Sequence, residues 1–190
     1  YMAKELNLDY DIFDSIMTAR EVQAKNLAMF VIETQKKYGG GIFLNGISYK
    51  PLFKIGDHKE LLAFFKQTQG NSNYPLIWLE MPFAENHINR KRVKLNNLNF
   101  ILAVETNTQM LYNERLKSTF LILNDLLDNV LHCFTQANTI SYDLNFDIVK
   151  YGNYSDVETA GLETKFSDIW DAVKLTINLE LNNNCLREIK

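Results

Sequence analysis

The chain has 190 residues, of which 46% are hydrophobic and 23% are charged, with a formal net charge of −3. The composition is that of a globular protein rather than a disordered one, and the length favours one domain over residues 1–190. The acidic balance argues against a dedicated nucleic-acid-binding module. No apolar run approaches the roughly 20 residues of a membrane-spanning helix, so we expect no membrane partner.

The N-terminal part of the chain predicts one helix and one hairpin. Apolar residues recur at three- and four-residue spacings over residues 11–38, which is typical of an amphipathic helix. The glycines 39–41 end it, because glycine accepts the left-handed conformation that follows many helices. Asn45-Gly46 lies between the apolar runs 42–44 and 47–49, and this pattern predicts a tight hairpin.

A second helix and a central strand follow. The helix is expected over residues 57–69, with Asp57 as its N-cap and Gly70 as its end. Residues 76–79 form a continuous apolar run, which indicates a strand covered on both faces. The polar residues 85–89 are interpreted as a connection to the next strand.

The next strand changes phase along its length. Apolar residues alternate over 98–104, whereas Val93 and Leu95 are in the opposite phase. An alternation of period two cannot switch phase without an extra residue, so we expect a bulge near Asn96-Asn97.

One long helix is expected at residues 110–136. Cys133 lies within it and is interpreted as a small buried hydrophobe. Neither it nor Cys185 has a metal or redox spacing, which favours a reduced, intracellular environment. The expected buried stripe consists of Leu116, Phe120, Leu123, Leu127, Val130 and Phe134, widened by Leu126 and Leu131.

Two alternating segments, 140–148 and 169–181, predict long strands with one face on the core. The polar stretch 151–168 between them is a loop, and a loop of this length in a compact domain is normally functional. The expected fold is therefore α+β: a mostly antiparallel sheet backed by one long helix and one or two others.

The sequence offers no catalytic, cofactor or metal site. The histidines His58, His87 and His132 have no nucleophile or metal spacing; His132 is interpreted as a core or boundary residue and His87 as solvated. Glu80 precedes a run of basic residues, a pattern that also occurs in metal-dependent nucleases. Such a site needs a further upstream aspartate, and a charged hairpin is the favoured interpretation.

Four basic residues gather in an otherwise acidic chain. They are the candidates for a contact with phosphate or with a partner, and that contact would be independent of base sequence. The alternative is a solvated hairpin whose lysines discourage unwanted strand pairing. The residues are Arg90, Lys91, Arg92 and Lys94.

The segment from residue 74 to residue 181 resembles a class of phage protein. The runs 74–83, 98–104 and 112–115, the long helix and the entry 169–171 of the last strand occur in the order found in short virion proteins of tailed bacteriophages. These proteins are of the tail-terminator or head–tail connector type. The likeness is one of pattern and element order over slightly more than half of the chain.

The resemblance implies a structural role in the virion, after synthesis in the cytoplasm of a bacterial host. It implies sixfold or twelvefold rings of identical copies that contact other neck or tail proteins. DNA would pass through the channel without sequence specificity, and no cofactor or catalytic residue would be needed. The long loop is the candidate docking element, with Tyr151, Tyr154, Asp156, Glu158 and Phe166 as its contacts.

Two other interpretations remain open. A small protein-binding adaptor fits the same patterning, and only the assembly state separates it from a ring protein. A metal-dependent nuclease is the third and would require metal binding that depends on Glu80. For the ring, we expect deletion of residues 152–168 to leave the fold intact and to impair assembly.

Overall fold

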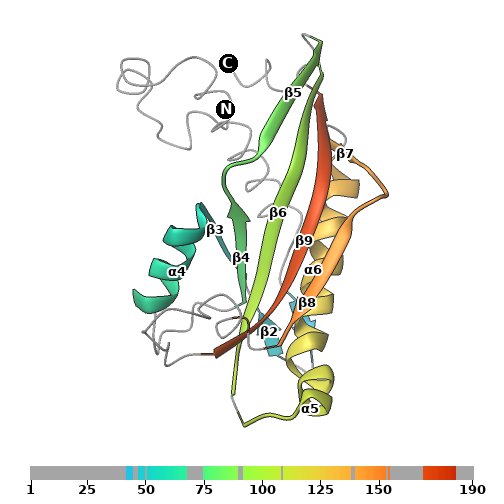
Figure 1. Ribbon diagram of the computed structural model, residues 1–190. Coiled ribbons are helices and arrows are strands. Elements are labelled where there is room, and N and C mark those ends of the chain that lie inside the picture. The colour runs from blue at the N-terminus through green and yellow to red at the C-terminus, as the bar shows by residue number, and fades with distance from the viewer. Residues whose placement is uncertain are drawn as a thin grey trace.

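A computed structural model describes residues 42–44, 47–49, 51–67, 75–89, 92–107, 109–137, 140–152, 154 and 169–182. These residues form the α+β structure that the sequence predicts, with helices on both faces of a mostly antiparallel sheet (Figure 1). The helix expected at residues 11–38, the glycines that end it and Gly70 lie outside the described residues.

The main sheet has the strand order β3-β4-β6-β9-β7, with β5 also on β6 and β8 also on β9. Among the strands that the structure describes, only β3 and β4 run parallel, and the other pairs of this sheet are antiparallel. Within the described residues the strands are β3 (Leu52–Gly56), β4 (Leu76–Glu80), β5 (Ala84–Asn89), β6 (Arg92–Thr106), β7 (Ile140–Tyr142), β8 (Asp147–Tyr151) and β9 (Ile169–Asn182).

The predicted hairpin is confirmed as β1 (Ile42–Leu44) paired antiparallel with β2 (Ile47–Tyr49). The predicted second helix is α4 (His58–Gln67). Asp57 caps it as expected: its Oδ1 accepts the N–H of Glu60 at 2.8 Å, and its own N–H donates to Glu60 Oε2 at 2.9 Å. This reciprocal arrangement satisfies two N–H groups at the start of the helix.

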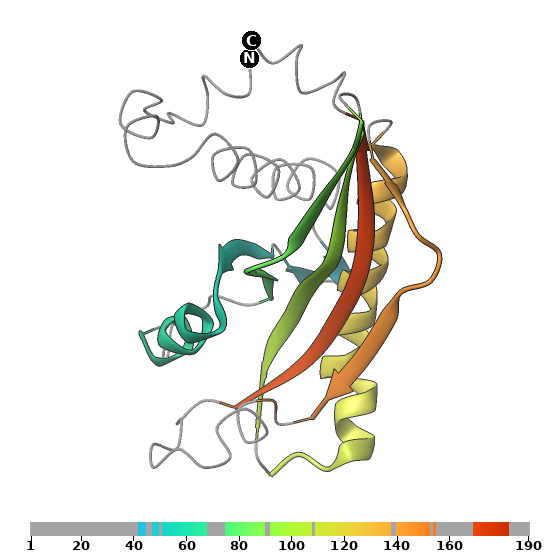
Figure 2. The ribbon, with the colours of Figure 1, turned by 45° about the horizontal axis from the view of Figure 1, so that its top comes forward.

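Two helices follow β6, namely α5 (Tyr112–Lys117) and α6 (Thr119–Gln136). Figures 1 and 2 show α6 along one face of β6 and β9, and α4 beyond the opposite face. Successive strand residues point to opposite faces, so the sheet contributes to two cores. We call these faces the α6 face and the α4 face.

The larger core lies between the sheet and α6. It contains Leu79, Phe100 and Leu175 from the sheet and Leu123 and Phe134 from α6, all at most 1% exposed. The smaller core lies on the α4 face at one end of the sheet, and its buried members are Leu61, Phe65, Leu76, Trp78, Ile101, Ala103, Tyr154, Trp170 and Ala172.

The predicted bulge is confirmed in β6. Asn96 and Asn97 lie opposite Asn178 alone, so β6 carries one extra residue. Asn97 has a φ of 55°, and its N–H donates to Asn178 Oδ1 at 2.9 Å. The extra residue returns Val93 to the face of Leu98, and both side chains are fully buried in the larger core.

The prediction of one long helix at residues 110–136 is wrong near its start. Ser118 interrupts it with φ −129° and ψ −87°, and its hydroxyl donates to the carbonyl of the residue four positions earlier at 2.8 Å. The break leaves Leu116 43% exposed and places Arg115 in the interior. The predicted stripe is buried from Phe120 onward: Phe120, Leu123, Leu126, Leu127, Val130 and Phe134, with Leu131 half-buried.

The single strand predicted at residues 140–148 is two strands. The four residues 143–146 lie between β7 and β8. On β9 only two residues, Ile177 and Asn178, lie opposite them, so the segment between β7 and β8 carries two extra residues. An insertion of two leaves the alternation in phase, and the sequence pattern therefore does not reveal it. Leu144, predicted to face the core, is 83% exposed.

The sequence pattern also misses two strands. β3 carries no clear alternation, yet it pairs with β4 and makes β4 the central strand that the apolar run 76–79 predicts. The interpretation of residues 85–89 as a connection is wrong, because they form most of β5. Polar side chains are tolerated there because β5 lies at an edge of the sheet.

Candidate functional site

A buried ion pair joins the start of β9 to α5. Asp171 lies at an odd-numbered position of β9, as do the residues of this strand that face the larger core, and it is fully buried. Its Oδ1 lies 2.5 Å from Arg115 Nη1, and its Oδ2 accepts the hydroxyl of Thr119 at 2.5 Å. Both carboxylate oxygens therefore have a donor, as a buried charge requires.

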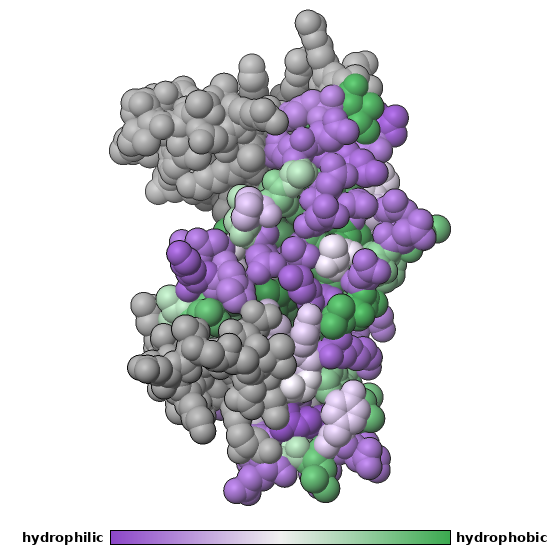
Figure 3. Space-filling view, in the orientation of Figure 1, coloured by the Kyte–Doolittle hydropathy of each residue, from purple (hydrophilic) through white to green (hydrophobic). Residues whose placement is uncertain are grey.

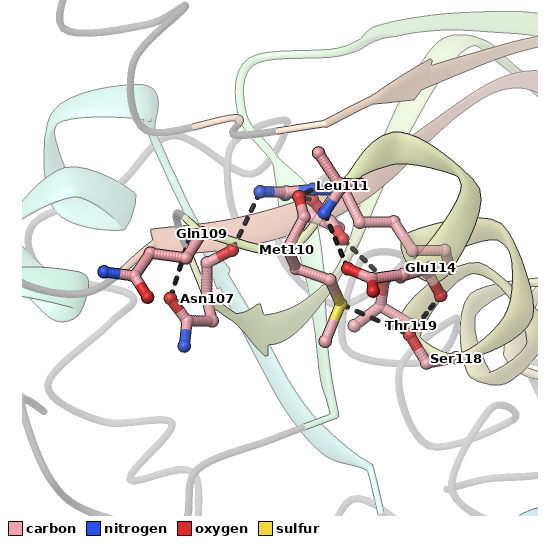
Figure 4. Close-up of polar contacts among 9 residues, drawn as sticks. Asn107, Gln109, Met110, Leu111, Glu114, Ser118 and Thr119 are labelled. Atoms are coloured by element: carbon pink, nitrogen blue, oxygen red, sulfur yellow. Dashed lines mark hydrogen bonds and ion pairs between the residues drawn. The ribbon is translucent and has the colours of Figure 1, made fainter.

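Arg115 also holds the turn between β6 and α5. Its Nε donates to the carbonyl of Met110 at 2.9 Å and its Nη2 to the carbonyl of Asn107 at 2.8 Å. Figure 4 shows this turn, in which Asn107 Oδ1 also accepts the N–H of Gln109. One guanidinium thus joins β9 and the turn, using the fixed fork of donors that arginine provides.

This cluster is a structural clamp rather than a reaction centre. Arg115 is 3% exposed and Asp171 is not exposed at all, so neither group is open to a substrate in this conformation. The positive and negative charges also neutralise each other at contact distance. Removal of either partner would leave the other charge buried and unpaired, which is the costly case for buried ion pairs.

A second polar cluster lies on the α4 face beyond the smaller core. Glu80 Oε1 is 3.4 Å from His58 Nδ1, and Glu80 Oε2 is 3.2 Å from Lys174 Nζ. The Glu80 side chain is only 16% exposed and that of Lys174 28% exposed. Glu80, the carboxylate considered for a nuclease, is thus engaged by two basic groups. Within the described residues, no set of three or more His, Cys, Asp or Glu side chains could hold a metal ion.

The basic cluster is only partly described. Arg90 and Lys91 lie outside the described residues. Arg92 forms an ion pair with Glu180, and Lys94 lies directly opposite the same glutamate on β9. The carboxylate therefore reduces the positive potential that Arg92 and Lys94 could offer to a phosphate group.

Two of the five residues proposed as docking contacts lie among the described residues. Tyr151 ends β8 and is half-buried, and its ring lies 5.1 Å from that of Tyr154. Tyr154 is 2% exposed and packs in the smaller core, so in this conformation its ring contacts the core of its own chain. The other three candidates, Asp156, Glu158 and Phe166, lie outside the described residues.

The burial of His87 and Cys133 agrees with the sequence prediction, whereas that of His132 does not. His132, expected in the core or at its boundary, is exposed. His87 is exposed as expected, with Nε2 3.2 Å from Glu85 Oε2. Cys133 is fully buried, and burial raises the pKa of its thiol to about 12. Cys133 is thus the small buried hydrophobe that the sequence predicts.

Exposed apolar side chains gather in two places that sequence reasoning missed. One is the α5 end, where Leu111 is 70%, Tyr112 58% and Leu116 43% exposed. The other is the β8 edge, where Ile148 is 40% and Val149 44% exposed. Figure 3 shows hydrophobic residues at the α5 end and on the side formed by β8. Ile148 and Val149 point to opposite faces of the sheet, so they flank the strand edge rather than form one patch. Exposed apolar surface of either kind is a mark of interaction sites.

The chain matches no protein-family model and no curated protein. None of the helices in the described part of the chain combines the length and the apolar character needed to cross a membrane.

Proposed function

We propose that the protein is a structural component of a tailed-phage virion that assembles with copies of itself into a ring at the neck or tail. The observation that carries this proposal is the β8 edge, where Ile148 and Val149 are exposed on a strand that pairs only with β9 among the described strands. An open strand edge with apolar side chains is a template for pairing with another chain.

The two lateral edges of the sheet differ, which favours a ring over a simple dimer. Figure 1 shows β3 on one side of the sheet and β8 on the other. A contact between unlike surfaces leaves one of each surface free on the outermost copies, so it adds further copies and forms a ring when the rotation between copies closes. The role as a tail terminator or head–tail connector comes from the resemblance described above.

The proposed role is structural and needs no reaction centre. Among the described residues, the buried charged residues are Arg115 and Asp171, and they hold the β6–α5 turn. The net charge of −3 would allow DNA to pass through a channel without strong attachment. Arg92 is compensated by Glu180, which is compatible with passage rather than capture of DNA.

Negative-stain electron microscopy of the purified full chain tests this proposal. We expect closed rings with a central channel and sixfold or twelvefold symmetry in the class averages. Fields that contain only single copies or irregular aggregates, at every protein concentration, would contradict a ring that forms without a partner.

A small protein-binding adaptor is the second candidate, and the α5 end favours it. Leu111, Tyr112 and Leu116 form an exposed apolar surface at the start of α5, where the Tyr112 ring lies beside Gly152, the residue directly after β8. Such a surface can bind a partner without self-association. A chain that keeps its single-copy mass of 22.1 kDa at all concentrations would favour the adaptor.

A further inference from the structure

The direction of the strands allows the sheet to continue from one copy into the next. β3 runs parallel to β4, and each later step from β4 through β6 and β9 to β8 is antiparallel. β3 and β8 therefore run in opposite directions at the two lateral edges. When a second copy is placed alongside with its sheet extending the first, its β3 is antiparallel to β8.

The charges on the two edges are complementary. Asp147 on β8 and Lys54 on β3 are both exposed. Asp147 pairs with Thr176 and Lys54 with Trp78, and both pairs belong to the α4 face. Within the described part of the chain Asp147 has no ion-pair partner, and the Lys54 ammonium lies 5.9 Å from the Phe64 ring centroid. Opposite charges that face each other across two strands stabilise the pair.

The same register matches the apolar residues. With Asp147 opposite Lys54, the exposed Ile148 lies opposite Phe53 on the α6 face. Val149 then lies opposite Leu52 on the α4 face. Phe53 and Leu52 are half-buried within one copy, so each retains surface that a second copy can cover.

Other registers lack this agreement. A shift by one residue would set side chains of opposite faces against each other, which directly opposed residues in an antiparallel pair do not do. A shift by two residues keeps the faces but places Asp147 opposite Leu52 or Gly56. The charge pair is then lost.

We propose that β8 of one copy pairs antiparallel with β3 of the next copy, with Asp147 opposite Lys54, Ile148 opposite Phe53 and Val149 opposite Leu52. The proposal rests on the proposed function for the existence of self-assembly, and it names the surface that carries it. The contact is heterologous, since β8 of each copy meets β3 of its neighbour, and a ring forms when the rotation between neighbouring copies closes. It is a case of recognition by strand addition.

Charge reversal tests this contact. Asp147→Lys and Lys54→Asp should each raise the protein concentration needed for half-assembly by about tenfold or more, because each puts like charges opposite each other. The variant that carries both changes should assemble nearly as well as the wild type. Asp128→Lys and Lys59→Asp are matched controls at exposed helical positions and should assemble as the wild type does. Circular dichroism establishes that each variant is folded.

Cysteine cross-linking supplies an independent readout. In a Cys185→Ser background, the pair Asp147→Cys and Lys54→Cys should form a disulfide between copies, because directly opposed residues have Cα atoms about 4.5–5.5 Å apart, a distance that a disulfide spans. The pair Asp128→Cys and Lys54→Cys is the control and should give no ladder of cross-linked species on a non-reducing gel.

The outcomes separate the two proposals. If rings persist in both charge-reversal variants and the double-cysteine variant forms no cross-link, the β8–β3 contact is overturned and the ring proposal stands. If the wild type does not assemble and the double-cysteine variant forms no cross-link at any concentration, both proposals are overturned. Assembly that is lost in each single variant and restored in the double variant supports the contact.

Discussion

The Arg115 guanidinium and the Asp171 carboxylate meet at 2.5 Å in the interior of the protein, although one residue belongs to α5 and the other to the start of β9. The contact ties the turn after β6 to β9, which is the direct antiparallel neighbour of β6. The ion pair therefore holds the turn at the α5 end against the sheet.

Asp171→Asn should lower the free energy of unfolding by about 3–5 kcal/mol, because it leaves the Arg115 charge buried without its partner. Urea denaturation followed by circular dichroism measures the change. Asp128→Asn removes the same charge from an exposed site and should change stability by at most about 0.5 kcal/mol. Equal stabilities of the two variants would show that the clamp does not stabilise the fold.

Leu127→Ala should cost about 2–5 kcal/mol of stability, since Leu127 is 6% exposed in the larger core and its truncation leaves a cavity. Leu144→Ala makes the same chemical change at a residue that is 83% exposed. Leu144→Ala should lower the free energy of unfolding by at most about 0.5 kcal/mol. Denaturant midpoints compare the two, and a costly Leu144→Ala would place that residue in a core or an interface.

Asn97→Val should destabilise the protein by about 1–2 kcal/mol, because a β-branched residue resists the left-handed conformation at φ 55°. Asn97→Gly accepts that conformation and should be close to neutral apart from the loss of chain entropy. Thermal unfolding of both variants measures the difference. A tolerated valine would mean that the bulge is not at this residue.

Cys133 should resist thiol reagents while the protein is folded. Burial raises the pKa of its thiol from 9.0 to about 12, so the reactive thiolate is scarce at neutral pH. A Cys185→Ser variant leaves Cys133 as the only cysteine, and we expect labelling in urea but not in buffer at pH 8. Because the folded pKa is the higher one, the contribution of Cys133 to stability is complete below pH 9 and is lost as the pH rises toward 12. Rapid labelling in buffer would contradict its burial.

Tyr154→Ala should cost roughly 3–5 kcal/mol, as truncation of a fully buried aromatic residue usually does. This changes the expectation for the loop: a deletion of residues 152–168 removes Tyr154 from the smaller core and should destabilise the fold. Thermal unfolding of the point variant and of the deletion measures both effects. An unchanged melting temperature in the deletion would restore the view of the whole loop as a docking element.

Local periodicity was enough to predict most of the core. The phase switch between Val93 and Leu98 indicated the bulge in β6, because period two is broken only by an odd number of extra residues. The stripe from Phe120 onward indicated the buried face of α6. Both signals are contained within one element.

The features that the sequence did not reveal depend on distant contacts. The pairing of β3 with β4 and the two extra residues before β8 leave no trace in the local pattern. One feature of the sequence indicates the Arg115–Asp171 ion pair. Asp171 occupies an odd position among the core-facing residues of β9, where a carboxylate requires a buried partner. The sequence did not indicate Arg115, because the break at Ser118 leaves Arg115 buried and the predicted core residue Leu116 exposed.

Multi-angle light scattering of the full chain over a range of concentrations tests self-assembly most directly. We expect a dominant species whose mass is six or twelve times 22.1 kDa, and we expect Asp147→Lys to shift the protein toward a single copy. A mass of 22.1 kDa at every concentration would contradict a ring that forms unaided. It would make the apolar α5 end, rather than the sheet edge, the surface that matters.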